Sequence, residues 1–411
     1  MHRPLSFMKY GATHGWRIDA FAGPAPDNEK EHGDELLARV PAAVRLHVVP
    51  QPSREPSYRL FPRIDGGFTA ALAHARFAID ALRQDPPDVV FASGPPFFTF
   101  VAARFVARHF NVPLVLDYRD EWTECPFDFV KKDGDDLKWE RRCLAAARAV
   151  LFATESFLKH QLDVFPELDS RRAHVVPNGW DPDDFKDASP DGSSLPHETK
   201  RDLRIAHVGS LSGHTPPLEF LESLRQLLTD RPEWISRLEV SFVGRRSLTA
   251  DAAIAAFPFP GVLRVVDQVS KREAIRLMHD ADVLLLLSAR GLERYLPSKL
   301  FEYLASRRPV LVFGFAGESS ALIEKLGAGV LSPPGSGEVL GDALMRLRAL
   351  DLSPHEEVVH AWMQDHRRDV LAARAFEIME SVSSPPSGGS ATGGREIRDA
   401  RSMQAREQKL G

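Results

Sequence analysis

The chain has 411 residues, 43% of them hydrophobic and 27% charged, which predicts about two or three soluble globular domains. Its formal net charge of −5, without a block of basic residues, argues against a nucleic-acid partner, and its two cysteines exclude a disulfide framework. The low cysteine content fits a reducing cytoplasm, where we expect the protein to lie. Because no apolar stretch approaches the roughly 18 residues of a membrane-spanning helix, any membrane contact is expected to be peripheral, at the inner face.

The first half of the chain alternates between strand and helix patterns. Helices are predicted from the spacing of alanine, leucine and phenylalanine over 4–13, 70–83, 97–109, 136–149 and 156–164. Short apolar runs predict strands over 16–21, 44–49, 88–92, 112–116, 150–153 and 174–177. Such alternation is typical of a parallel sheet covered by helices.

A charged and aromatic motif follows the strand at 112–116. Residues 117–122 run Asp-Tyr-Arg-Asp-Glu-Trp. Charges at the carboxyl end of a parallel strand are costly unless they face a cleft, where α/β proteins bind ligands. The alternative is a solvated loop in which an arginine and an aspartate pair locally.

The second half repeats the alternation. Strands are predicted over 204–209, 238–243, 262–266, 281–287 and 309–313, with helices over 218–228, 273–280 and from 298 onward. Two doubly wound domains with a cleft between them follow from this pattern. The predicted organisation is a first domain over 1–186, a linker over 187–202, a second domain over 203–353, one long helix over 354–382 and a disordered tail over 383–411.

The stretch most informative about function is 295–313. A helix is predicted to begin at Pro297 and Ser298, after a buried strand, so that Lys299 and Glu302 project from one face of its first turn. At the carboxyl edge of a parallel sheet, Lys299 can meet a phosphate and Glu302 can accept hydrogen bonds from a sugar diol. An ion pair on an ordinary surface helix explains the same spacing equally well.

Residues 298–305 run Ser-Lys-Leu-Phe-Glu-Tyr-Leu-Ala, and Arg-Pro-Val-Leu and then Gly-Ala-Gly-Val follow. This series closely resembles the donor-site signature of family 4 glycosyltransferases of the two-Rossmann, or GT-B, fold. The resemblance extends with gaps from about residue 2 to residue 330 and is most specific over 282–330. It implies an α/β GT-B fold, a C-terminal helix that crosses back to the first domain, and a ribose held by Glu302.

The resemblance also bears on the first domain. In the family, a first strand and a glycine-rich loop precede the helix that matches 4–13, whereas this chain begins at the helix. Either the gene model starts too late or the domain forms without that strand; we favour the late start, because removing a central strand bares the hydrogen-bonding groups of its neighbours. Members of the subgroup carry a similar Arg-Asp-x-Trp that faces the cleft, which implies that Arg119 and Asp120 line the acceptor side.

Two positions depart from the family pattern. Members commonly carry an arginine and, five residues later, a lysine where this chain has Ser210 and Thr215. The groups that can replace those cations are Arg245 or Arg246, Lys299, and the backbone amides at Gly209 and Ser298. Many members also carry a glutamate eight positions before Glu302, where this chain has Arg294 beside Glu293. Either Arg294 contacts the diphosphate or sugar, or the loop shifts so that Glu293 serves.

Histidines add little to this assignment. His207 lies within a predicted strand and is expected to be structural, while His214 in the donor loop is a modest candidate. No spacing typical of a metal site occurs, so we expect neither a metal nor another cofactor.

The resemblance implies a hexosyltransferase that moves a sugar from a nucleoside diphosphate sugar to a glycan or lipid-linked acceptor, with retained configuration, in envelope or extracellular polysaccharide synthesis. The catalytic assignments are Lys299, Asp120 and Arg119. The donor-binding assignments are Glu302, Ser298, Gly209, Ser210, Gly244, Arg245 and Arg294. The alternatives are a nucleotide-sugar epimerase or hydrolase of the same fold, and an inactive sugar-nucleotide-binding partner protein.

Overall fold

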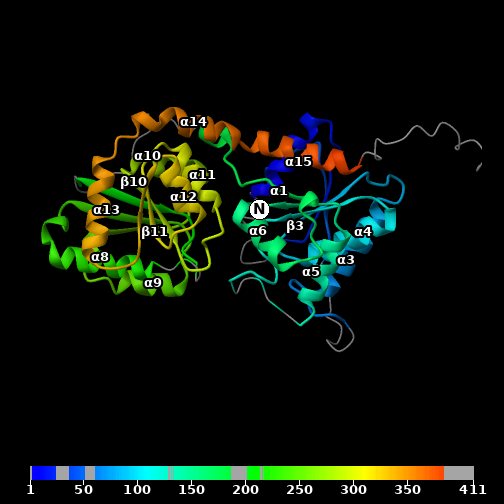
Figure 1. Ribbon diagram of the computed structural model, residues 1–411, viewed down its shortest axis with the longest axis horizontal. Coiled ribbons are helices and arrows are strands. Elements are labelled where there is room, and N and C mark those ends of the chain that lie inside the picture. Colours follow the sequence, from blue (N-terminus) through cyan, green and yellow to red (C-terminus); the bar gives the residue numbers. More distant parts are fainter. Residues whose placement is uncertain are drawn as a thin grey trace, which may run out of the picture.

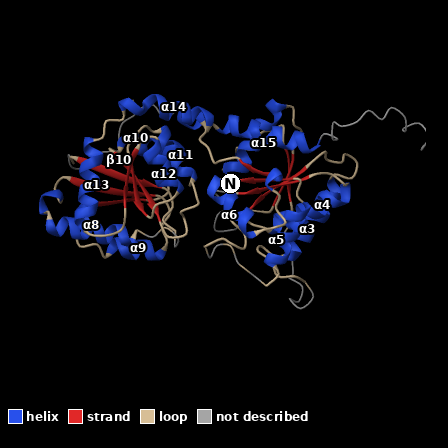
Figure 2. Ribbon diagram, in the orientation of Figure 1, coloured by secondary structure: helices blue, strands red, loops and turns tan. Residues whose placement is uncertain are grey.

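The computed structural model describes residues 2–24, 37–50, 61–127, 130, 132, 134–186, 201–212, 215 and 217–383. Within these ranges the chain forms two α/β domains that lie side by side and are linked by the C-terminal helices (Figure 1). Parallel strands form the centre of each domain, and helices cover them (Figure 2). The predicted fold class is confirmed. Most of the predicted linker, 187–200, and the predicted tail from residue 384 lie outside the described residues.

The described strands of the N-terminal domain form two parallel sheets. One pairs β1 (Asp19–Ala22) with β2 (Arg45–Val48), and the other has the order β3 (Val90–Gly94), β4 (Leu114–Tyr118), β5 (Ala149–Phe152), β6 (Ala173–Val175). The helices are α1 (His2–Gly11), α3 (Phe68–Ala81), α4 (Phe98–Phe110), α5 (Asp136–Ala146), α6 (Glu155–Val164) and α7 (Pro182–Lys186). Among the described residues, no backbone hydrogen bonds join β1 to β3. The facing edges of these two strands, which a central strand was expected to cover, therefore have no partner strand in that part of the chain.

In the C-terminal domain the described strands form one parallel sheet of order β12-β11-β10-β7-β8-β9. The strands are β7 (Leu203–Val208), β8 (Leu238–Val243), β9 (Leu263–Val266), β10 (Val283–Ser288), β11 (Val310–Gly314) and β12 (Gly329–Ser332). The helices are α8 (Leu218–Asp230), α9 (Leu248–Ala255), α10 (Lys271–Asp280), α11 (Ser298–Ala305), α12 (Glu318–Lys325) and α13 (Gly337–Ala349). The strand order reverses between β7 and β10, and in such sheets ligands bind at the carboxyl ends of the strands beside the reversal.

Burial explains why the central strands are so apolar. Every residue of β4 and β10 is buried, because helices pack on both faces of a parallel sheet. Each fully buried leucine in such a strand contributes about 1.5–3 kcal/mol relative to exposure. Side-chain oxygens of Thr154 and Ser270 accept hydrogen bonds from the first turns of α6 and α10, which fixes where those helices begin.

The prediction of one long helix over 354–382 is wrong. The structure has two helices, α14 (Glu356–Asp365) and α15 (Arg368–Ser383). The backbone leaves the helix between them because the Trp180 amide donates to the His366 carbonyl at 3.2 Å and the Arg368 amide donates to the Trp180 carbonyl at 2.9 Å.

The two helices connect the domains. Helix α14 packs against α11 of the C-terminal domain, while α15 packs against α1 and β5 of the N-terminal domain (Figure 1). Leu371, Phe376 and Met379 of α15 share an apolar cluster with Phe7. The expected return of the chain to the first domain is therefore confirmed. None of the described helices combines the length and the apolar character needed to cross a bilayer.

Candidate active site

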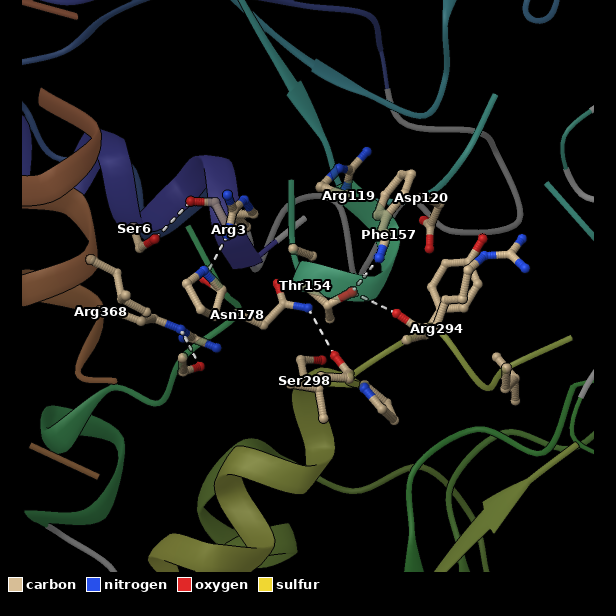
Figure 3. A pocket seen from close by; sticks show the side chains of 18 of the residues that line it. Arg3, Ser6, Arg119, Asp120, Thr154, Phe157, Asn178, Arg294, Ser298 and Arg368 are labelled. Atoms are coloured by element: carbon tan, nitrogen blue, oxygen red, sulfur yellow. Dashed lines mark hydrogen bonds between the residues drawn. The ribbon is translucent and has the colours of Figure 1, made fainter. Parts of the chain in front are cut away.

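A cavity of about 350 Å³ lies between the two domains. Its N-terminal wall comes from the start of α1, the loop after β4 and the start of α6, and its C-terminal wall comes from the β10–α11 loop and the start of α11 (Figure 3). Residues 177–179, Ser212 and Thr215 of the loop after β7, and Arg368 and Leu371 of α15 also line it. The cavity therefore opens at the carboxyl ends of parallel strands, which is the usual ligand position in α/β folds.

Arg119 and Asp120 line this cavity, as predicted. The Arg119 amide donates to the Gly94 carbonyl at 3.0 Å, and its guanidinium donates to the carbonyls of Gly94 and Pro95. Among the described residues the Asp120 carboxylate makes no hydrogen bond. Burial raises the pKa of Asp120 to about 6, against the opposing attraction of Arg119. A carboxyl group with such a pKa can exchange a proton or bind a hydroxyl near neutral pH.

The rest of the motif at 117–122 does not face the cavity, contrary to the prediction. Asp117 is fully buried, and Arg3 binds it with a shortest nitrogen–oxygen distance of 2.7 Å. Tyr118 and Trp122 belong to the apolar core, where Trp122 stacks on Phe97 at a centroid distance of 5.0 Å. These side chains hold the loop instead of contacting a ligand.

A buried carboxyl group also fixes this loop. Glu140 of α5 accepts hydrogen bonds from the amide and hydroxyl of Thr123 and from the hydroxyl of Tyr118. Burial raises the pKa of Glu140 to about 7. Buried contacts therefore hold the loop that carries Arg119 and Asp120 on both sides of these residues, at Asp117 and at Thr123.

On the opposite side, α11 begins at Ser298, which lines the cavity. The side chain of Lys299 points to the loop after β7, and its Nζ lies 3.3 Å from Nε2 of His207. The φ of Gly209 is +141°, a conformation that favours glycine, and a Cβ atom there would lie 2.9 Å from this Nζ, so a larger residue would also displace the lysine head. Burial lowers the pKa of Lys299 to about 8.

The other predicted donor residues lie near this point but outside the cavity lining. Gly209 and Ser210 follow β7, and Gly244 and Arg245 follow β8; the Leu211 amide donates to the Arg245 carbonyl at 2.8 Å. Arg245 is exposed, and its side chain donates to Gln268. Their placement agrees with a donor site at the strand reversal, whereas their individual roles stay predictions.

Two predicted donor residues are engaged by other protein groups. The Glu302 carboxylate forms an ion pair with Lys271 of α10. Arg294 lines the cavity, but its guanidinium binds the fully buried Glu121 of the N-terminal domain, 2.7 Å away at the shortest distance. Glu121 was not singled out from the sequence, because nothing in the local pattern indicates a partner 173 residues away. His214 lies outside the described residues, and the described part of the chain has no cluster of three or more side chains that could hold a metal.

The comparisons with known proteins agree with this architecture. Residues 4–179 match the family described as glycosyl transferase 4-like domain. No curated protein matches the chain.

Several solved structures share its fold. A glycosyltransferase from Rickettsia africae ESF-5 is 12% identical, with a TM-score of 0.67 over 93% of this chain and 94% of its own. A UDP-forming α,α-trehalose-phosphate synthase from Burkholderia xenovorans is 15% identical, with a TM-score of 0.67 over 90% and 100%. The E. coli trehalose-6-phosphate structure bound with UDP-2-fluoro glucose is 13% identical, with a TM-score of 0.67 over 90% and 94%. Residues 4–179 are therefore similar to the glycosyl transferase 4-like domain, and the chain as a whole has the GT-B fold.

Proposed function

We propose that the protein is a glycosyltransferase that moves a hexosyl group from a nucleoside diphosphate sugar to an acceptor held against the N-terminal domain. The observation that carries the proposal is the cavity between Asp120 and the N-terminus of α11. One wall offers a carboxyl group that titrates near pH 6, and the other offers helix amides with Lys299 behind them. The wall with Asp120 therefore suits a hydroxylated acceptor, and the wall with the start of α11 suits a diphosphate.

The donor would bind to the C-terminal domain. Its diphosphate would rest on the amides at Ser298 and Gly209 and on the ammonium of Lys299, because the helix N-terminus and the cation both favour negative charge. The carboxylate of Glu302 has acceptor capacity beyond its bond to Lys271 and would hold the ribose hydroxyls. The solved relative that is bound with UDP-2-fluoro glucose supports a nucleotide sugar in this fold.

The chemical step is one displacement at the anomeric carbon. The bond from this carbon to the phosphate oxygen breaks, a bond to the acceptor oxygen forms, and the proton of the acceptor hydroxyl passes to the leaving diphosphate, with configuration retained. Lys299 and the helix amides would stabilise the charge that grows on the diphosphate. Arg119 and Asp120 would orient the acceptor, which we propose is a glycan or a lipid-linked glycan of envelope or extracellular polysaccharide synthesis, reached by peripheral membrane contact. No step requires a metal.

Product analysis tests the proposal. The protein would be incubated with uridine, guanosine, adenosine and thymidine diphosphate sugars and a panel of glycan acceptors, and the products would be separated by mass. A new glycosidic bond together with free nucleoside diphosphate supports transfer. Free sugar without transfer indicates a hydrolase, an altered nucleotide sugar indicates an epimerase, and binding without turnover indicates a sugar-nucleotide-binding protein.

A further inference from the structure

The β10–α11 loop, residues 289–297, packs into the core of the other domain. Tyr295 is buried in the main apolar cluster of the N-terminal domain, and Leu292 packs against the same cluster. The Tyr295 ring lies 5.7 Å from that of Phe127 and 6.0 Å from that of Phe157, measured between centroids. A loop that belongs to the C-terminal domain in sequence is thus anchored in the N-terminal core.

An ion pair whose carboxylate is fully buried and whose guanidinium is partly exposed accompanies this packing. The Glu121 carboxylate, which is 0% exposed, accepts from Nε and Nη2 of Arg294 at 3.0 and 2.7 Å. Its second oxygen also accepts from the Tyr295 hydroxyl at 2.8 Å. The two parallel bonds from one guanidinium give this contact a defined geometry as well as a favourable energy.

The loop backbone is held as well. The Thr154 hydroxyl donates to the Arg294 carbonyl at 2.6 Å, and the Asn178 side-chain amide donates to the Leu296 carbonyl at 3.2 Å (Figure 3). Leu296 lies only two positions before Ser298, the first residue of α11. Whatever fixes the loop therefore also fixes the N-terminus of α11 relative to the N-terminal domain.

We propose that Glu121 is a positioning residue, which clamps residues 289–297 to the N-terminal domain and thereby sets Lys299 and the start of α11 at a fixed distance from Arg119 and Asp120. What is positioned rests on the proposed function, whereas the clamp is a property of the fold. Transfer between two bound substrates is sensitive to small displacements, so a loosened clamp lowers the rate without removing either binding site. If Glu121 only stabilises the domain interface, its loss changes the melting temperature and leaves the turnover of the folded enzyme unchanged.

Hydrogen exchange tests the clamp directly. The amides of Leu292 and Tyr295 are hydrogen-bonded within the loop and serve as probes. In Glu121→Gln and in Arg294→Gln we expect their exchange to accelerate by on the order of tenfold or more, because each change breaks the two parallel hydrogen bonds between these side chains, and Arg294→Gln also leaves the buried Glu121 carboxylate without its cation. The double variant should add little to either single one, since both break the same contact.

The matched control is Glu124→Gln. Glu124 lies on the same loop as Glu121 and is more exposed. Both carboxylates lie near Nε2 of His160, at 3.6 Å for Glu124 and 3.7 Å for Glu121, but the ion pair with Arg294 belongs to Glu121. In Glu124→Gln, the amides of Leu292 and Tyr295 should exchange at the same rates as in the wild type. Unchanged exchange in the folded Glu121→Gln and Arg294→Gln proteins overturns the clamp. If these do not fold, Arg294→Lys keeps the positive charge but loses the two parallel hydrogen bonds to Glu121, and unchanged exchange in that variant has the same meaning.

Kinetics test the positioning role. We expect Glu121→Gln to lower kcat by on the order of tenfold to a hundredfold while the affinity for a nucleoside diphosphate stays within about threefold, because the donor groups all lie on the C-terminal domain. Accelerated exchange with unchanged kcat overturns the positioning role. Absence of transfer by the wild type counts against the proposed function, and the exchange result still decides whether Glu121 clamps the loop.

Discussion

Lys299 shares its buried site with His207. Its Nζ lies 3.3 Å from Nε2 of this histidine, whose Nδ1 lies 3.0 Å from the Leu285 carbonyl oxygen. The Nδ1–H therefore donates to that carbonyl, which leaves Nε2 to accept from the lysine. Burial lowers the pKa of His207 well below its usual value, so the imidazole stays neutral beside the ammonium. Burial also lowers the pKa of Lys299 to about 8, against the opposing attraction of Glu302.

The first prediction concerns the pH dependence of nucleotide binding. A diphosphate bound at the proposed site would stabilise the charged lysine and raise its pKa above about 8, so that binding would take up a proton at higher pH. The affinity for a nucleoside diphosphate should fall as the pH rises above about 8, by up to about tenfold per unit. Calorimetry between about pH 7 and about pH 9.5 measures this, and Lys299→Met should remove the slope. A wild-type affinity that is flat over this range contradicts the role of Lys299.

The second prediction separates Lys299 from Glu302. In the proposed mechanism, Lys299 meets charge that grows as the diphosphate leaves, whereas Glu302 holds the ribose equally before and during the reaction. Lys299→Ala should reduce kcat by a factor that corresponds to about 2–4 kcal/mol, as does loss of one oxyanion-hole donor. Glu302→Ala should mainly raise the KM for the donor.

Thermal unfolding shows whether the Lys299→Ala and Glu302→Ala variants are folded. Because the folded state lowers the pKa of Lys299 from 10.5 to about 8, the unfolded chain binds more protons between these values, and wild-type stability rises with pH across that window. Removing this buried charge should therefore leave the melting temperature at pH 7 unchanged or higher. A folded Lys299→Ala enzyme with near-normal kcat would place the diphosphate on Arg245, Arg294 or backbone amides.

The third prediction concerns Asp120. Burial raises its pKa from 3.8 to about 6, so the folded state binds more protons than the unfolded chain between these values, and its contribution to stability falls as the pH rises through this range. Asp120→Asn should raise the melting temperature at pH 7. It should also lower kcat/KM by on the order of a hundredfold and remove the part of the pH–rate profile near 6. An unchanged kcat/KM in Asp120→Asn would show that Asp120 lines the cavity but has no role in transfer.

The sequence predicts those parts of the structure that depend on local pattern. The run at 281–287 and the helix start at Ser298 are recognisable because a buried strand and a helix N-terminus have local signatures, and both are observed. The break between α14 and α15 is not predictable in this way, since it depends on Trp180, which is remote in the chain. Glu121 was overlooked for the same reason, because its partner Arg294 lies 173 residues away in the chain.

The fourth prediction is that turnover survives chelation. The described residues offer no metal-binding cluster, and Lys299 with the helix amides can neutralise the leaving group in place of a divalent cation. Activity should be unchanged in excess EDTA. Loss of activity that manganese restores would overturn the prediction.

The account as a whole depends on a nucleotide site at the start of α11, and ligand-dependent thermal unfolding tests this directly. Among uridine, guanosine, adenosine and thymidine diphosphates at millimolar concentration, at least one should raise the melting temperature. A ligand present at about 100 times its Kd contributes about 2.7 kcal/mol to the stability of the folded state. Lys299→Ala should diminish the shift, and Lys325→Ala, an exposed lysine of α12, should preserve it. If none of these nucleotides shifts the wild-type transition, the assignment of the donor site is contradicted.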